Sequence, residues 1–172
     1  MALDNEQRAI VRSAVAALLV TASVLFITAS LPLFEADTIE DRLTLLVAAF
    51  APLALVLVRD IGRLANHRFI ERLDRNAAAA DTKTAKADML SAILRNTHEQ
   101  VTLAMLIYAI AAITLPPRFT DAILACSALF LTGRVVFAAG YAKGAGRRAF
   151  GFGLTFYPSI VLALSTATIA FI

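Results

Sequence analysis

Five long apolar runs, separated by polar segments, dominate the chain. They cover residues 11–34, 43–58, 89–115, 122–142 and 151–172. A helix needs about 20 apolar residues to cross a bilayer core, and the second run reaches that length when residues 59–63 are included. Pro52 should bend this helix without ending it, because a neighbouring helix can hydrogen-bond the carbonyl that proline leaves free. The pattern predicts an all-α bundle of five membrane-spanning helices.

The composition supports this class. Hydrophobic residues make up 59% of the 172 residues, and the mean hydropathy is +0.75. One soluble core of this size could not bury so much apolar surface. The first run could be interpreted as a signal peptide, but it is longer than the usual apolar core of one, and Asp4 and Glu6 accompany Arg8 and Arg12 at the amino end. We therefore expect a retained spanning helix.

The basic residues predict the orientation. With five spans, thirteen lysines and arginines lie on one side, two lie on the other, and Arg134 lies within a span. This bias places the amino terminus in the cytoplasm and fits membrane topology better than nucleic-acid binding. The thirteen are Arg8, Arg12, Arg59, Arg63, Arg68, Arg72, Arg75, Lys83, Lys86, Arg95, Lys143, Arg147 and Arg148; the two are Arg42 and Arg118.

Polar residues cluster where the third run begins and the fourth ends. Both positions lie at the cytoplasmic side in this topology, and a guanidinium inside an apolar helix is costly unless it faces a partner, a cavity or the interface. Anchoring at the interface remains open for the arginines, as does a structural ion pair between Glu99 and Arg134. The alternative is an anion site built from Arg95, Asn96, Glu99, Arg134, Tyr141 and Arg148.

At these residues the chain resembles the MAPEG family, the membrane-associated proteins of eicosanoid and glutathione metabolism. The Arg-Asn-x-x-Glu pattern starting at Arg95 is similar to the motif of the family's second helix, and the stretch from Arg134 to Arg148 is similar to its third helix and following loop. The resemblance implies four-helix protomers in a homotrimer, with glutathione between protomers near the cytosolic face. It implies that Arg148 acts beside the glutathione sulfur, with the other residues of the pocket being Arg95, Asn96, Glu99, Arg134 and Tyr141.

The resemblance covers residues 43–172, which we expect to form a MAPEG-like four-helix domain, and residues 1–42 would add a further spanning helix and loop. Two positions depart from the family's pattern. Ala92 stands where some members have another arginine, and Phe137 stands where several glutathione-using members have tyrosine or histidine.

Two classes of function remain open. One is a glutathione transferase or peroxidase acting on lipophilic electrophiles that enter from the lipid. The other is a non-catalytic lipid-binding or scaffold protein, with a subunit of a larger assembly as a variant. Cys126 is the only cysteine, and the two histidines do not have metal-ligand spacing, so we expect no metal site. The alanine-rich chain favours a bacterial inner membrane.

Overall fold

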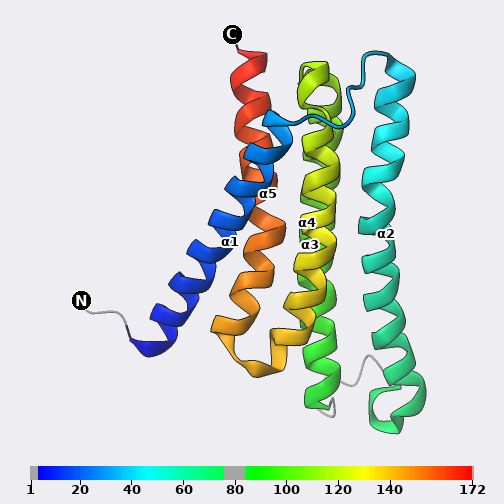
Figure 1. The fold of residues 1–172 in the computed structure, drawn as a ribbon. Helices are drawn as coiled ribbons and strands as arrows, with labels where there is room; N and C mark the ends of the chain where they lie inside the picture. The colour runs from blue at the N-terminus through cyan, green and yellow to red at the C-terminus, as the bar shows by residue number, and fades with distance from the viewer. Residues whose placement is uncertain (1–3, 76–83, 172) are drawn as a thin grey trace.

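The computed structural model describes residues 4–75 and 84–171, in which successive long helices run antiparallel in one bundle (Figure 1). The long helices are α1 (Asn5–Ser30), α2 (Ile39–Ile70), α3 (Ala85–Thr114), α4 (Asp121–Gly140) and α5 (Ala145–Ala170). Short 3-10 helices lie in the connections: η1 (Arg72–Asp74), η3 (Pro117–Phe119) and η4 (Tyr141–Lys143). No strand occurs in these described ranges, and the prediction of an all-α bundle is confirmed. The alanine-rich segment 77–80 lies outside them.

Local sequence signals set the first two helix starts. Asp4 accepts a hydrogen bond from the Gln7 backbone, while the Gln7 side chain accepts one from the Asp4 backbone. Thr38 and Asp41 form the same reciprocal arrangement at the start of α2. Each pair satisfies two of the backbone N–H groups that a helix start leaves without partners.

Pro52 lies inside α2 and does not end it, as the sequence predicted. In the turn before it, the carbonyl oxygen of Ala49 accepts a hydrogen bond of 2.7 Å from Ser127 Oγ of α4. A neighbouring helix thus supplies a polar contact beside the proline, which is the kind of compensation that a helix in lipid requires.

Within residues 4–75 and 84–171, four helices are long and apolar enough to cross a membrane: α1, α2, α4 with its flanking turns, and α5. The remaining long helix, α3, runs beside them for 30 residues but does not meet the same criterion. Six successive polar residues, 95–100, lie at the middle of this helix. The sequence predicted five spans. Helix α3 does not meet the criterion for a spanning helix because it carries the polar motif.

Large apolar side chains point outward from all five helices. Examples are Leu19, Val47, Ile113, Val135 and Leu164, of which Ile113 is 75% exposed. Exposed apolar surface of this extent is unfavourable in water and favourable in a bilayer. The core itself is closely packed around Leu53, Tyr108, Ile123 and Phe130, each with no exposed surface. The outer surface of the bundle therefore contacts lipid.

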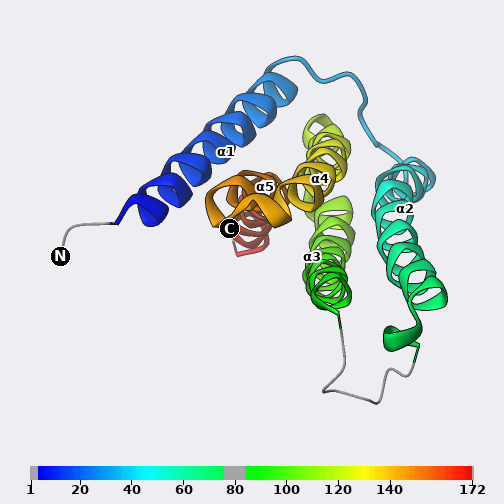
Figure 2. The same ribbon diagram turned by 90° about the horizontal axis from the view of Figure 1, so that it is seen from below.

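Helix α1 crosses the outside of the bundle and packs mainly against α5 (Figure 2). Hydrogen bonds hold its two ends. Ser13 Oγ donates to the Gly146 carbonyl at 2.8 Å, and beyond the other end the Leu33 N–H donates to Asp121 Oδ2 at 2.9 Å. The first helix is therefore an integral part of the bundle.

The amino-terminal end of α1, the facing ends of α2 and α3, and the turn between α4 and α5 lie at the same end of the bundle, the lower end in Figure 1. These segments contain most of the basic residues. The fold therefore has the arrangement that the positive-inside rule needs, with the loop after α1 at the opposite end.

Single cysteines at Asp37 and at Lys143 should react with impermeant thiol reagents from opposite sides of the membrane, with Lys143→Cys reactive from the cytoplasm. The thirteen-to-two charge bias is the reason. Cys126 is fully buried and should give little background. Labelling of both positions from one side would contradict the five-span topology. A cysteine at Asp81, in the connection between α2 and α3, should label from the same side as Lys143→Cys; this position lies outside the described residues.

Candidate functional site

The turn between α4 and α5 positions the arginine expected to act on a thiol. Helix α4 ends at Gly140, and Gly144 has a φ of 99°, a conformation that glycine adopts without strain. Helix α5 then begins at Ala145, so Arg147 and Arg148 lie in its first turn and not in a loop. The sequence pattern placed the fifth apolar run too late because charged residues at a helix start do not register as part of an apolar run.

A cavity of about 340 Å³ lies beside this turn and brings three predicted site residues together. The Arg148 guanidinium carbon lies 5.0 Å from the centre of the Tyr141 ring, and Tyr141 meets Phe137 edge to face at 5.4 Å. Asn96 of α3 and Ile10 of α1 also line the cavity. The lining is completed by Ala145, Ala149 and Phe152. The cavity thus combines a cation and hydrogen-bond donors with aromatic walls.

Arg134 lies behind this cavity and is fully buried. One of its terminal nitrogens donates to Asn96 Oδ1 at 2.9 Å, and the other donates to Thr97 Oγ1 at 3.0 Å. Its guanidinium also lies over the Phe137 ring, 4.1 Å from the ring centre. Arg134 therefore supports two residues of the cavity wall and does not line the cavity itself.

Asp60 of α2 supplies the buried counter-charge, a role that the sequence did not reveal. It is 3% exposed, and its Oδ2 accepts a hydrogen bond of 2.7 Å from Thr97 Oγ1. Its Oδ1 lies 2.9 Å from the side-chain nitrogens of the adjacent Arg59. The sequence places Asp60 at the charged end of an apolar run, where an acid normally reaches solvent. The sequence feature that could have indicated this role is the position of Asp60 as a single acid among several arginines.

Arg95 and Glu99 do not join the cavity within one protomer. Arg95 lines a separate cavity of about 460 Å³ between α2 and α3, and Glu99 is exposed. Consecutive helical residues point about 100° apart, so Arg95 cannot share the direction of Asn96. The predicted set therefore divides into an inner group on the Asn96 side and an outer group on the Arg95 side.

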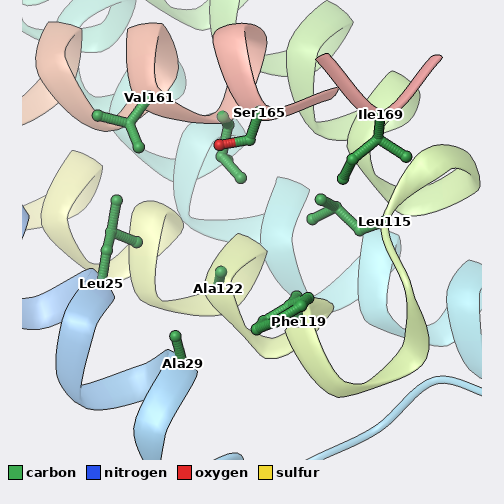
Figure 3. A pocket seen from close by; sticks show the side chains of 9 residues that line it. Leu25, Ala29, Leu115, Phe119, Ala122, Val161, Ser165 and Ile169 are labelled. Carbon is green, nitrogen blue, oxygen red and sulfur yellow. The ribbon is translucent and has the colours of Figure 1, made fainter. Parts of the chain in front are cut away.

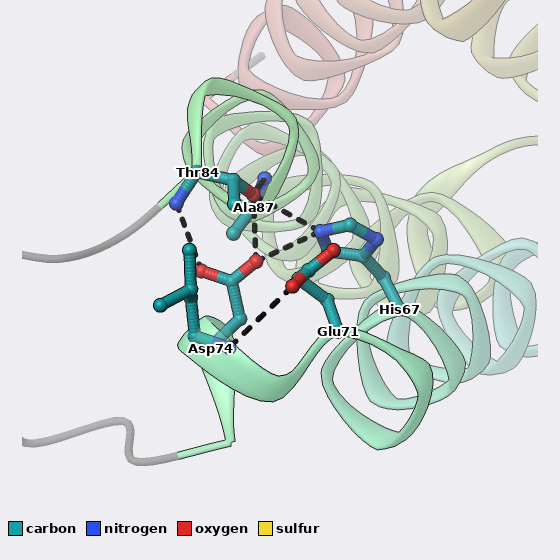
Figure 4. Close-up of polar contacts among 6 residues, drawn as sticks. His67, Glu71, Asp74, Thr84 and Ala87 are labelled. Atoms are coloured by element: carbon teal, nitrogen blue, oxygen red, sulfur yellow. Dashed lines mark hydrogen bonds and ion pairs between the residues drawn. The ribbon is translucent and has the colours of Figure 1, made fainter.

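A second polar cluster holds the entry to α3 (Figure 4). Asp74 accepts hydrogen bonds from the backbone N–H and the hydroxyl of Thr84, at 2.9 and 2.6 Å, and its Oδ2 lies 2.9 Å from His67 Nε2. Thr84 in turn caps α3 by accepting from Ala87 N–H. The side-chain hydrogen bond from Thr84 lowers the pKa of Asp74 below its ordinary value. A lowered pKa stabilises the fold above the ordinary aspartate range, and this contribution is lost as the pH falls through the lowered value.

An apolar pocket of about 260 Å³ lies near the opposite end of the bundle from the turn between α4 and α5, and no arginine lines it (Figure 3). Helices α1 and α5 and the turn before α4 form it, and Ser165 is its one polar side chain. Its other lining residues are Leu25, Ala29, Leu115, Phe119, Ala122, Val161, Leu162 and Ile169. This pocket can hold an apolar group, but it lacks the charges that an anionic reactant requires.

The lipid-facing helices and the donor-lined cavity at one end define an integral membrane protein with a polar site inside a helix bundle. The sequence model of the MAPEG family matches residues 43–168, which is most of the chain. The protein therefore belongs to this family. Helix α1 lies outside the matched residues. No curated protein and no solved structure gave a match.

Proposed function

We propose that the protein is a membrane-bound, glutathione-dependent transferase or peroxidase that acts on lipophilic electrophiles. One observation carries the proposal: the cavity brings Asn96, Tyr141 and Arg148 together beside lipid-facing helices. A site that joins a polar thiol to an apolar acceptor needs polar residues for the thiol compound and access from the lipid for the acceptor. Membership of a family associated with glutathione use supports the choice of thiol.

The residues of the cavity fit glutathione. Its carboxylates and peptide carbonyls are hydrogen-bond acceptors, and the Tyr141 hydroxyl and the Asn96 amide can donate to them. When bound, glutathione supplies a thiol that becomes a nucleophile on ionisation. A guanidinium beside a thiol lowers the pKa of that thiol, and this is the role that we assign to Arg148.

The outer group gains a role if the protein is a homotrimer, as the family resemblance implies. Arg95 and Glu99 would then complete a glutathione site from the neighbouring protomer, with Arg95 binding a carboxylate and Glu99 the ammonium group. Arg134 would contribute through the wall residues that it supports. We place the site at the cytoplasmic face of the membrane, because the basic ends of the helices lie at that end of the bundle. The alanine-rich chain favours a bacterial inner membrane.

A second candidate is a non-catalytic lipid-binding or scaffold protein on the same fold. The apolar pocket formed by α1 and α5 favours it, because its lining suits an acyl chain and no reactive side chain lies within it. Phe137 also favours it, since a phenylalanine replaces the polar residue of several glutathione-using family members.

Native mass spectrometry in mild detergent should show three protomers, and added glutathione should bind with up to one molecule per protomer. Calorimetry on the same sample gives the affinity. Oxidised glutathione and free cysteine serve as controls for the shape of the ligand. A protein that remains monomeric would contradict the trimer, and absence of detectable glutathione binding would end the enzyme proposal and leave the lipid-binding one.

A further inference from the structure

A continuous hydrogen-bonded chain links an acid in α2 to the cavity wall. Asp60 Oδ2 accepts from Thr97, the Thr97 oxygen accepts from Arg134, and Arg134 donates to Asn96 Oδ1. The three distances are 2.7, 3.0 and 2.9 Å. Three helices contribute to the chain, and its last member, Asn96, lines the cavity.

The chemistry of the end groups fixes the direction of every bond. An ionised carboxylate can only accept, so the Thr97 hydroxyl must donate to Asp60 and present its lone pairs elsewhere. A guanidinium can only donate, so the Asn96 oxygen, and not its nitrogen, must face Arg134. The Thr97 hydroxyl and the Asn96 amide could each donate or accept, and the fixed roles of Asp60 and Arg134 decide which of the two each group does.

We propose that Asp60 is a positioning residue which, through Thr97 and Arg134, holds the Asn96 side chain with its NH₂ group available to the cavity. The Asn96 side of the cavity wall then presents a donor and selects for a ligand that carries an acceptor there, such as a carboxylate. This choice of ligand rests on the proposed function, whereas the orientation of Asn96 does not.

Asp60 is suited to this role by its charge. Among the described residues, the buried Arg134 guanidinium donates only to the neutral side chains of Asn96 and Thr97. The Asp60 carboxylate, which Thr97 bridges to Arg134, therefore compensates its charge. An unpaired buried charge is strongly destabilising. Arg59 lies against the other oxygen of Asp60 and is partly exposed, which leaves Asp60 paired when Arg134 is removed.

Thermal unfolding of variants tests the chain without any ligand. Asp60→Asn should lower the melting temperature by roughly 10 °C, because Arg134 loses its counter-charge. Arg134→Met should lower it less, and the double variant should lose clearly less than the sum of the two single losses. Asp88→Asn makes the same chemical change at an exposed position of α3 and should have little effect. Additive losses in the double variant would overturn the link between Asp60 and Arg134.

Two further substitutions test the orientation itself. Asn96→Asp keeps an acceptor toward Arg134 and should leave the melting temperature unchanged or higher, whereas Asn96→Leu should lower it. Thr97→Ser keeps the hydroxyl and should preserve stability, whereas Thr97→Val should not. Equal losses for Asn96→Asp and Asn96→Leu would overturn the assigned orientation, whether or not the wild-type protein binds glutathione.

Glutathione binding then separates positioning from mere packing. Asn96→Asp should weaken binding by about tenfold or more while stability is retained, because it replaces a donor by a negative charge at the cavity. Asp60→Asn, measured well below its melting temperature, should also weaken binding, and Asp88→Asn should not. Unchanged affinity in the folded Asp60→Asn and Asn96→Asp variants would contradict a positioning role. Failure of the wild type to bind would instead count against the proposed function alone.

Discussion

Gly151→Ala should destabilise the protein by about 3 kcal/mol, more than any other single methyl group added to the bundle. A Cβ atom at this position would lie 2.6 Å from the Gly133 carbonyl oxygen and still closer to the backbone nitrogen of Phe137. Backbone atoms of a packed helix cannot move aside as a flexible side chain can. The substitution would therefore push α5 away from α4, and with it Arg148 away from Tyr141.

Gly62→Ala is the matched control. A Cβ atom there would meet no other atom within 4 Å, so alanine should be neutral or stabilising by up to about 1 kcal/mol through its better helix propensity. Thermal unfolding in detergent, followed by circular dichroism, measures both variants. Equal stability of the two would show that α4 and α5 do not approach each other closely at Gly151.

Arg148→Ala should slow glutathione conjugation at neutral pH by roughly 100-fold while leaving glutathione affinity within a few-fold. The proposed work of Arg148 is to favour the thiolate, and the thiol is a weak nucleophile without it. The removal raises the pKa of the bound thiol, so the activity profile of the variant should shift to higher pH. The loss should shrink in alkaline solution, where the thiol ionises unaided.

Arg147→Ala removes the same charge from the neighbouring residue, which is exposed and does not line the cavity. It should leave turnover unchanged. Conjugation of a generic aromatic electrophile, measured across pH for the wild type and both variants, makes the comparison. Equal losses of turnover in the two variants would show that only the net charge matters. No loss in Arg148→Ala would show that this arginine has no catalytic role.

Most of the fold could be predicted because lipid imposes a simple pattern. Apolar runs and the clustering of basic segments are local features, and the apolar runs located all five long helices. The boundaries that differed are those at charged residues. Helix α2 continues to Ile70 and α5 starts at Ala145 because long charged side chains at a helix end can reach water without ending the helix.

The candidate site was only partly predictable. Asn96, Tyr141 and Arg148, which the family motif and the shared depth of two helix ends had grouped together, line one cavity. The separation of Arg95 from Asn96 follows from helical periodicity within one protomer, and the roles of both residues remain predictions. Asp60 was missed because its partner is 37 residues away and no local pattern marks which acid becomes buried.

The buried guanidinium also constrains how the protein can be made. Arg134 enters the bilayer within α4, where an unpartnered arginine costs about 2.5–3.5 kcal/mol on insertion scales. Its acceptors, Asn96 and Thr97, are on α3, and the Asp60 carboxylate that Thr97 contacts is on α2. Both helices precede α4 in the chain and so emerge first from the ribosome. When the helices insert in this order, the acceptors of Arg134 are already in the membrane when α4 enters it. A circularly permuted chain that begins with α4 would have to insert Arg134 before any of its acceptors.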